Sequence, residues 1–156
     1  MTVYLALGTN LGDRHSHLQQ ARSLIAEKIG SFSAISSIYE TEPWGFVSEN
    51  KFLNQVVAVE TDLSPLEILS RTQEIEHQIG RKEKTGRSYQ DRPIDIDLIL
   101  CGDMILNTEK LQLPHPLFHK RRFVLEPLNE IAPDLVHPVL GRTVTQMLHG
   151  LFLQLS

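Results

Sequence analysis

The stretch from 93 to 100, Pro-Ile-Asp-Ile-Asp-Leu-Ile-Leu, constrains the fold more than any other part of the chain. Because side chains alternate between the two faces of a strand, Asp95 and Asp97 project from one face, while the apolar residues between and beside them project from the other. Two neighbouring carboxylates repel one another, so the pair indicates a divalent cation, and magnesium is typically held by one or two carboxylates. Two ordinary solvated aspartates are the alternative.

Periodicity and turn signals predict further strands at 2–7, 32–39 and 52–61. An apolar helical stripe from Leu18 to Ile29 is expected to end at a left-handed Gly30. A second helix is expected at 64–80, because Ser64-Pro65-Leu66-Glu67 combines an N-cap, a first-turn proline and a reciprocal capping glutamate.

The order strand-helix-strand-strand-helix-strand predicts an α+β fold of ferredoxin-like type. Its β-α-β-β-α-β core is an antiparallel sheet with helices packed on it, followed by short C-terminal helices. A hairpin is expected within 104–113, and a last helix is expected to begin at Thr143. The length of 156 residues, without repeats or linkers, predicts one domain over 1–156.

The net charge is −4, yet the basic side chains gather in two segments, 81–92 and 110–122. The composition of 81–92 predicts a polar surface loop that follows the second helix. Two basic clusters beside a carboxylate pair fit a small phosphorylated ligand, and the acidic total disfavours a nucleic-acid partner. Solvated charge runs paired with nearby acidic residues are the alternative.

Several other classes of protein are disfavoured by what the sequence lacks. A single cysteine, Cys101, excludes a disulfide framework within the chain and a cysteine-based zinc cluster, and this residue is expected in the core. No apolar run reaches the length of a membrane span and no signal-peptide pattern opens the chain, so we expect a cytoplasmic protein without a membrane segment.

Some local features point toward a ligand site. Gly8 and Gly12 flank a strand-to-helix turn, but no phosphate-loop motif is present, so a tight turn before a capped helix is expected. His115 alone among the histidines looks placed, because it stands between two prolines. Aromatic residues near Asn54, including Phe52, suit a flat heteroaromatic ligand whose polar edge an amide reads, although core filling explains most aromatics.

An ordered set of motifs carries a family resemblance. The motifs are Ala6-Leu-Gly-Thr-Asn10, Phe52-Leu-Asn-Gln-Val-Val-Ala-Val-Glu60, Ile75-Glu76, Gly80-Arg81, Arg92-Pro-Ile-Asp-Ile-Asp-Leu-Ile-Leu100, Leu113-Pro-His-Pro116 and Glu130-Ile-Ala-Pro133. Over nearly its whole length the chain resembles the 6-hydroxymethyl-7,8-dihydropterin pyrophosphokinases of folate biosynthesis. The resemblance implies transfer of the β,γ-pyrophosphoryl group of ATP to the hydroxymethyl oxygen of the dihydropterin, with release of AMP.

The resemblance also implies roles for individual residues. Two Mg²⁺ ions would be held by Asp95 and Asp97, and the catalytic group comprises Arg81, Arg92, Asp95 and Asp97. The ATP-binding set would be Gln73, Glu76, Arg92, Leu98, Lys110, Gln112, His115 and Arg121. The pterin-binding set would be Thr41, Glu42, Trp44, Phe52, Asn54, Tyr89 and Phe123. The basic loop at 81–92 resembles a lid that closes over both substrates.

The chain departs from the family pattern at several places and leaves other functions open. Tyr89-Gln90-Asp91 stands where Trp-Gly-Pro is common, Phe52 where tyrosine is frequent, and Lys110 where arginine is frequent. A magnesium-dependent nucleotidyl transferase, which would release pyrophosphate, is one alternative. A non-catalytic ferredoxin-like binding module is another, but it has no use for two repelling carboxylates. The expected partners are ATP and the dihydropterin, with neither nucleic acid nor membrane, and the enzyme is expected to be a monomer.

Overall fold

The computed structural model describes residues 1–42, 51–80 and 93–155. Its strands are β1 (Thr2–Thr9), β2 (Ser31–Ile35), β3 (Tyr39–Thr41), β4 (Phe52–Glu60), β5 (Asp95–Cys101), β6 (Leu106–Asn107) and β7 (Gln112–Leu113). Its helices are α1 (Arg14–Lys28), α2 (Pro65–Gly80), the short 3₁₀ helix η1 (Phe118–Lys120), α3 (Arg122–Ile131) and α4 (Val144–Leu155).

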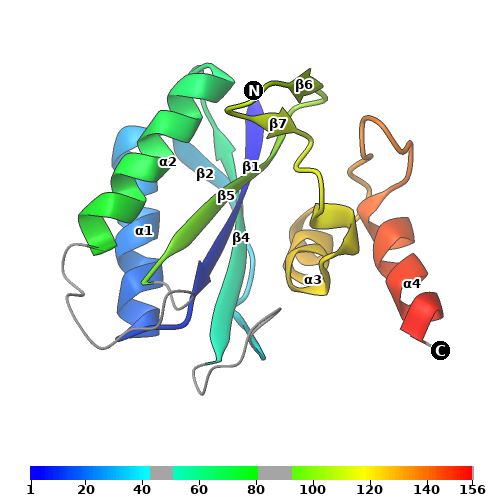
Figure 1. Cartoon of the computed structure of the whole chain (residues 1–156), viewed down its shortest axis with the longest axis horizontal. Helices are drawn as coiled ribbons and strands as arrows, with labels where there is room; N and C mark the ends of the chain where they lie inside the picture. The colour runs from blue at the N-terminus through cyan, green and yellow to red at the C-terminus, as the bar shows by residue number, and fades with distance from the viewer. Residues whose placement is uncertain (43–50, 81–92, 156) are drawn as a thin grey trace.

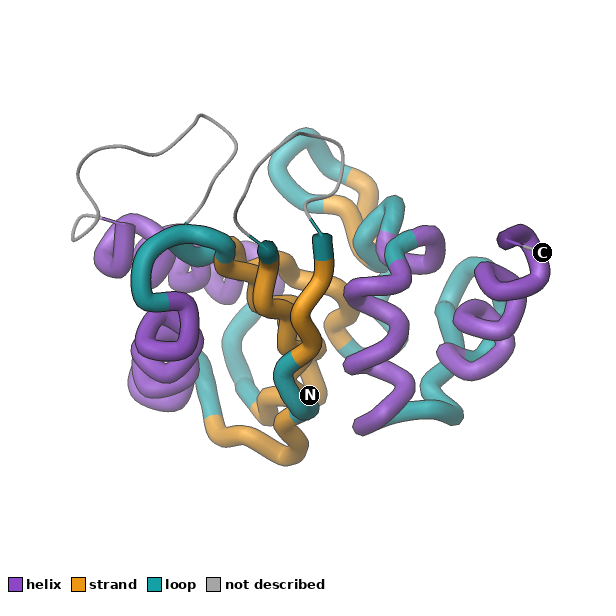
Figure 2. The backbone as a smooth tube through the Cα atoms, turned by 90° about the horizontal axis from the view of Figure 1, so that it is seen from below, coloured by secondary structure: helices purple, strands orange, loops and turns teal. Residues whose placement is uncertain are grey.

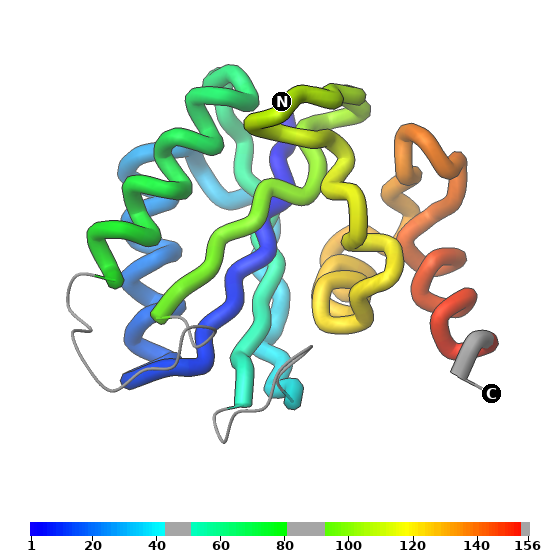
Figure 3. The backbone as a smooth tube through the Cα atoms, in the orientation of Figure 1, coloured from blue at the N-terminus to red at the C-terminus, as the bar shows by residue number. Residues whose placement is uncertain are grey.

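The main sheet has the strand order β2-β4-β1-β5, and β3 pairs with β4 beyond this path. All of these pairings are antiparallel. Strand β4 lies between β1 and β2, which are joined through α1, so the connection is a split β-α-β unit of the ferredoxin-like type. The expected fold class is therefore confirmed. Strand β5 forms one edge of the sheet in the described part of the chain, beside β1 (Figure 3).

Helices α1 and α2 cover one face of this sheet (Figure 1). Leu5 of β1, Ile25 of α1 and Ile75 of α2 are all completely buried in the core that these elements share. The capping box predicted for α2 is present, because Ser64 Oγ accepts from the Glu67 N–H at 3.3 Å and the Ser64 N–H donates to Glu67 Oε1 at 3.4 Å. The helix ends at Gly80, as expected.

The opposite face of the sheet is covered by α3, with α4 packed on α3 as an outer layer (Figures 1 and 2). Val56 of β4, Leu125 of α3 and Val144 of α4 belong to this second core. The sequence predicted short C-terminal helices but not that they would line the second face. Helix α4 begins one residue after its predicted start, and Thr143 caps it through a 3.1 Å bond from the Gln146 N–H to Thr143 Oγ1.

Two predictions for the segment 30–39 are wrong. The single strand expected at 32–39 is interrupted between β2 and β3, where the Ser36 hydroxyl accepts from the Val56 N–H at 3.0 Å and the Ser37 N–H bonds to a side chain of α3. Gly30 does not have a positive φ. A Cβ there would lie 2.0 Å from the carbonyl oxygen of Glu60, so glycine is required by a close backbone approach rather than by a left-handed cap.

Several other local expectations agree with the structure. Strands β6 and β7 form the predicted hairpin, with Leu106 paired to Leu113. Cys101 is 1% exposed, and burial raises the pKa of its thiol to about 11, which is consistent with a core residue. Within the described ranges, no helix is both long enough and apolar enough to cross a membrane.

Candidate active site

Asp95 and Asp97 lie on β5 with their side chains on the same face, as the alternation predicted. Both residues are half-buried, whereas Ile96 between them is 4% exposed and belongs to the core under α1 and α2. The carboxylates therefore face the side of the sheet on which α3 packs. Strand geometry alone produces this arrangement, because residues i and i+2 of a strand share a face.

The residues of β1 that pair with the two aspartates are small. Asp95 pairs with Gly8, and Asp97 pairs with Ala6. Gly8 pairs on its other side with Asn54 of β4, so Asp95, Gly8 and Asn54 form one row across three strands. Directly paired residues of antiparallel strands point to the same face, so an acidic group and an amide flank a residue without a side chain.

Gly8 is a residue that the sequence reasoning misplaced. It was expected in a turn, but it lies within β1 and is paired with both neighbouring strands. A Cβ at this position would lie 3.7 Å from Asn54 Oδ1 and 3.8 Å from Phe52 Cδ1. Because Gly8 has no side chain, only backbone lies between Asp95 and Asn54 at this position. The sequence signal is that Ala6 and Gly8, two residues apart, are both small.

Three of the residues expected to bind pterin, Thr41, Phe52 and Asn54, come together where β3 pairs with the start of β4. Thr41 pairs with Phe52, and Tyr39 pairs with Asn54. Asn54 is 5% exposed, and its amide nitrogen donates to Thr41 Oγ1 at 2.7 Å and to the Tyr39 carbonyl oxygen at 3.4 Å. These bonds fix the orientation of the amide. Phe123, at the start of α3, packs against the second core together with Ala6.

The other pterin residues are placed differently or not described. Glu42 is on the surface, where its carboxylate lies 3.6 Å from Lys51 Nζ. Trp44 and Tyr89 lie outside the described residues, as do the catalytic arginines expected at 81 and 92. The lid expected at 81–92 lies outside them as well.

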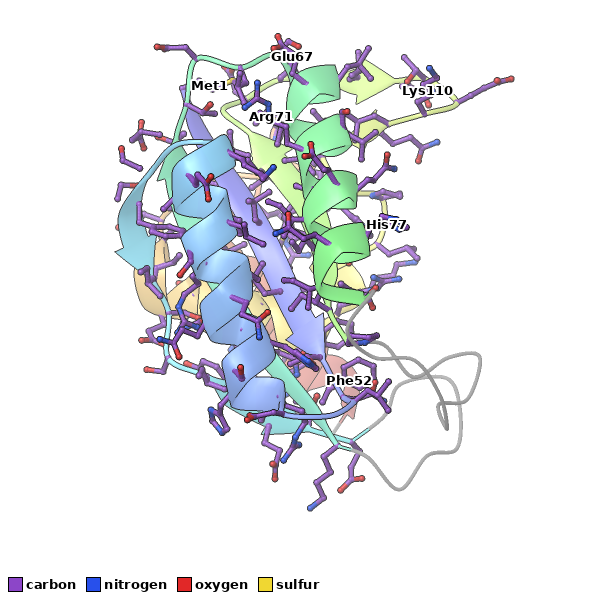
Figure 4. All side chains as sticks on the ribbon, turned by 90° about the vertical axis from the view of Figure 1, so that its left-hand side faces the viewer. Met1, Phe52, Glu67, Arg71, His77 and Lys110 are labelled. Carbon is purple, nitrogen blue, oxygen red and sulfur yellow. The ribbon has the colours of Figure 1, made fainter. Side chains whose placement is uncertain are left out.

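Residues expected to bind ATP surround a hollow of about 270 Å³ beside β5. Its lining includes Asp97, Leu98, Lys110, Gln112 and His115, which come from β5, from the β6–β7 hairpin and from the segment after it. The structure thus joins a metal-ligand candidate to four members of the predicted ATP set. In the view of Figure 4, Lys110 lies near the top of the molecule and Phe52 lies in its lower half.

His115 has a defined place and a fixed tautomer in this hollow. Its Nδ1 accepts from the Leu117 N–H at 3.1 Å, so a neutral imidazole carries its proton on Nε2 and offers it as a donor. Burial lowers the pKa of His115, the Asp97 carboxylate opposes that shift, and the Arg121 guanidinium adds to it. The guanidinium carbon of Arg121 lies 5.7 Å from the centroid of the Phe123 ring, so a residue expected to bind ATP contacts one expected to bind pterin.

The remaining ATP candidates belong to α2. Glu76 Oε2 accepts from the Ile96 N–H at 2.8 Å, so this carboxylate contacts the backbone between the two aspartates. Gln73 is exposed one turn earlier on the same helix. The described residues contain no group of three or more His, Cys, Asp or Glu side chains arranged for a metal ion. The oxygen pair of Asp95 and Asp97 fits Mg²⁺ when substrate phosphates supply further ligands.

The chain is similar to known proteins of one family. Residues 4–133 match the family model described as 7,8-dihydro-6-hydroxymethylpterin-pyrophosphokinase (HPPK). A curated relative from Porphyromonas gingivalis, named 2-amino-4-hydroxy-6-hydroxymethyldihydropteridine pyrophosphokinase, is 49% identical over 138 residues, which cover 87% of this chain and 93% of the relative. A relative of the same name from Aquifex aeolicus is 41% identical over 93% of this chain and 89% of its own length.

Solved structures show the same fold at lower sequence identity. A crystal structure described as HPPK-DHPS in complex with substrates has a TM-score of 0.74 and 16% identity, covering 99% of this chain. Wild-type HPPK-DHPS of Plasmodium falciparum has a TM-score of 0.72 and 19% identity, covering 96% of this chain. The chain spans 44% and 43% of these two proteins, respectively, so it corresponds to only part of each.

Proposed function

The chain belongs to the 7,8-dihydro-6-hydroxymethylpterin-pyrophosphokinase family, and we propose that it transfers the β,γ-pyrophosphoryl group of ATP to 6-hydroxymethyl-7,8-dihydropterin. In this reaction the hydroxymethyl oxygen attacks the β-phosphorus. The bond between the β-phosphorus and the oxygen bridging to the α-phosphorus breaks, AMP leaves, and the hydroxyl proton is released. The pterin diphosphate that results serves folate biosynthesis.

The row of Asp95, Gly8 and Asn54 is the observation that carries the proposal. It has the Asp95 carboxylate and a fixed amide on one face of the sheet, with a glycine between them. The dihydropterin would lie against Gly8, with Asn54 at its polar edge and the rings of Phe52 and Phe123 as walls. Its hydroxymethyl group would then face the carboxylates. Positioning of this kind provides much of the acceleration in phosphoryl-type transfer.

The hollow beside β5 would take ATP. Leu98 is 5% exposed and offers an apolar contact to the base, while Lys110 and Gln112 offer polar contacts. The Nε2–H of His115 and the guanidinium of Arg121 would bind phosphate oxygens, with Arg81 and Arg92 completing the set. Because Asp97 lines this hollow and also belongs to the β5 pair, it lies where the two substrates meet.

We assign two Mg²⁺ ions to Asp95 and Asp97. When bound, the ions neutralise phosphate charge and lower the pKa of the attacking hydroxyl. The chain holds the two carboxylates together on one strand. They lie beside Gly8 and Ala6 of β1, and Asp97 also lines the hollow proposed for ATP. We further propose that 1–156 acts as a monomer, in the cytoplasm where ATP is available.

Product analysis tests the proposal. Purified protein is incubated with ATP, MgCl₂ and 6-hydroxymethyl-7,8-dihydropterin, and the nucleotide products are separated. AMP formed in equal amount to the pterin diphosphate is expected, and omission of magnesium is expected to abolish both. Release of pyrophosphate with AMP attached to the acceptor would instead support nucleotidyl transfer. Binding of both compounds without any turnover would support a binding module.

A further inference from the structure

Glu130, near the end of α3, makes a dense set of hydrogen bonds to the segment that leads into β3. Its two carboxylate oxygens accept from the Ser37 N–H at 3.0 and 3.1 Å. The Ser37 hydroxyl donates to Oε2 at 2.9 Å, and the Tyr39 hydroxyl donates to Oε1 at 2.8 Å. Both oxygens are therefore engaged by donors more than 90 residues away in the sequence, so α3 is fixed to the sheet at this point.

This contact lies one step from the residues that we assign to the pterin. Tyr39 pairs with Asn54, and its carbonyl oxygen accepts from the Asn54 amide at 3.4 Å. Thr41, two residues further along β3, accepts from the same amide at 2.7 Å. The position of β3 therefore determines how Asn54 is oriented. Since Glu130 holds Tyr39 by its side chain, the carboxylate controls that position from α3.

Helix α3 also carries Phe123, which we assign to the side of the pterin site opposite Asn54. Phe123 precedes Glu130 by seven residues, which is about two helical turns, so both side chains lie on the same side of α3. Helix α3 contacts both β3 and β4. The charge of Glu126, between these two residues, also raises the pKa of Tyr39, which indicates that α3 runs beside β3. Fixing α3 at Glu130 thus sets the separation between Phe123 and Asn54.

The protonation states keep this contact intact near neutral pH. Burial first, and then its bond to Glu130, raise the pKa of Tyr39 to about 12, so the phenol remains a donor. The hydrogen bond from Tyr39 and those from Ser37 lower the pKa of Glu130, so the carboxylate remains an acceptor. Charge-assisted bonds of this kind are stronger than neutral ones.

We infer that Glu130, with Ser37 and Tyr39, is a positioning device for the pterin pocket, which sets the spacing between the Phe123 wall and the Asn54 edge. This inference rests on the proposed function, since it assumes that the pterin binds at this face. It assigns none of the three residues a direct contact with substrate. Its consequence is selective: loss of the device weakens pterin binding and leaves ATP binding nearly unchanged.

The test compares Glu130→Ala and Glu130→Gln with Glu126→Ala. The control removes a carboxylate from the preceding turn of α3, where Glu126 pairs with the exposed Arg122. Dihydropterin affinity is measured by fluorescence titration, with and without a non-hydrolysable ATP analogue, and KM values are measured separately for both substrates. Glu130→Ala is expected to weaken pterin binding roughly tenfold. The KM for ATP should stay within about twofold, as for uncoupled sites.

The glutamine variant keeps one acceptor oxygen and is expected to show a smaller loss of pterin affinity, while Glu126→Ala should bind like the wild type. Equal rises in both KM values, or unchanged pterin affinity in Glu130→Ala, would overturn the inference. If Glu130→Ala does not fold, Tyr39→Phe removes only one hydrogen bond, and unchanged pterin affinity in that variant is equally decisive. Wild-type protein that binds pterin but releases no AMP contradicts the proposed function instead.

Discussion

Glu76 and Ile96 are joined by a hydrogen bond of 2.8 Å from the Ile96 backbone nitrogen to Glu76 Oε2. Ile96 lies between the two aspartates of β5, which forms an edge of the described sheet. An edge strand directs alternate N–H groups away from its neighbour, and an acceptor from α2 satisfies one of these groups here. Helix α2 thus fixes the backbone that carries both carboxylates.

Removal of this acceptor is expected to disturb the metal ligands rather than the fold. Glu76→Ala should lower kcat/KM by roughly 10- to 100-fold, the usual range when a group that orients metal ligands is lost. Glu76→Gln retains an acceptor and should keep most of the activity. Hydrogen exchange of the Ile96 amide, measured by NMR, should accelerate in the alanine variant only. Glu74→Ala, which removes an exposed carboxylate paired with Lys28, is the control. If the glutamine variant is as impaired as the alanine variant, then the charge of Glu76 is what matters.

Asp97→Ala is expected to abolish most activity without unfolding the protein. Asp97 is half-buried on the ligand face and its side chain is not part of the core under α1 and α2. The loss should be about 4 kcal/mol of transition-state stabilisation, or about a thousandfold in kcat/KM. Rates of AMP formation and thermal unfolding curves are compared with those of Asp103→Ala, in the exposed turn after β5. Activity within about tenfold of the wild type would refute the metal-ligand assignment.

Gly8→Ala tests whether the dihydropterin lies against Gly8, between Asp95 and Asn54. The new Cβ would lie at ordinary contact distance from Asn54 and Phe52, so the variant should fold. The methyl group would occupy the space that we assign to the pterin. The affinity of the variant for the dihydropterin should therefore fall about tenfold, the usual scale of overpacking. Gly80→Ala is the matched control, because a Cβ there meets no atom within 4 Å among the described residues. Equal pterin affinities in the two variants would place the substrate elsewhere.

Local signals predicted much of this fold because they act over a few residues. The capping box of Ser64 and Glu67 and the alternation around Asp95 depend only on neighbours in the chain, and both appear as expected. The strand at 32–39 was predicted wrongly because Ser36 and Ser37 at its interruption bond to Val56 and Glu130, which are 20 and 93 residues away. Gly30 was misread for the same reason, since its neighbour is the backbone of Glu60 on another strand.

The candidate site shows the same division between local and distant causes. The carboxylate pair was visible in one strand, and the ordered motifs named Asn54 and His115. How Asp95 and Asn54 lie relative to one another depends on the strand order, which pairs Gly8 with both residues. The small residues Ala6 and Gly8 are the only local signal there, and they do not by themselves separate a turn glycine from a glycine within a sheet. The roles expected for Arg81 and Arg92 stay predictions, because both lie outside the described residues.

His137 is expected to make stability depend on pH in the weakly acidic range. The residue is 5% exposed, stacks on Phe118 at 5.3 Å between ring centroids, and accepts at Nδ1 from the Val139 and Leu140 N–H groups at 3.1 and 3.0 Å. Burial, and secondly the charge of nearby His119, lower its pKa from the ordinary value of 6.5. Protonation of Nδ1 would also break both hydrogen bonds.

The direction in which stability changes with pH follows from where the proton binds more readily. Below pH 6.5 the unfolded chain binds a proton at His137 more readily than the folded protein does, so the free energy of unfolding falls as the pH drops from 6.5 toward the folded pKa. His119 contributes in the same direction, because burial and the charges of Lys120 and Arg142 lower its pKa. Urea unfolding at pH 7.5 and 5.5 should show a smaller pH-dependent loss for His137→Asn than for the wild type. His15→Asn, at an exposed position, should retain the wild-type loss. Equal losses in all three proteins would show that the acid sensitivity originates elsewhere, since asparagine can accept the same backbone bonds but does not titrate.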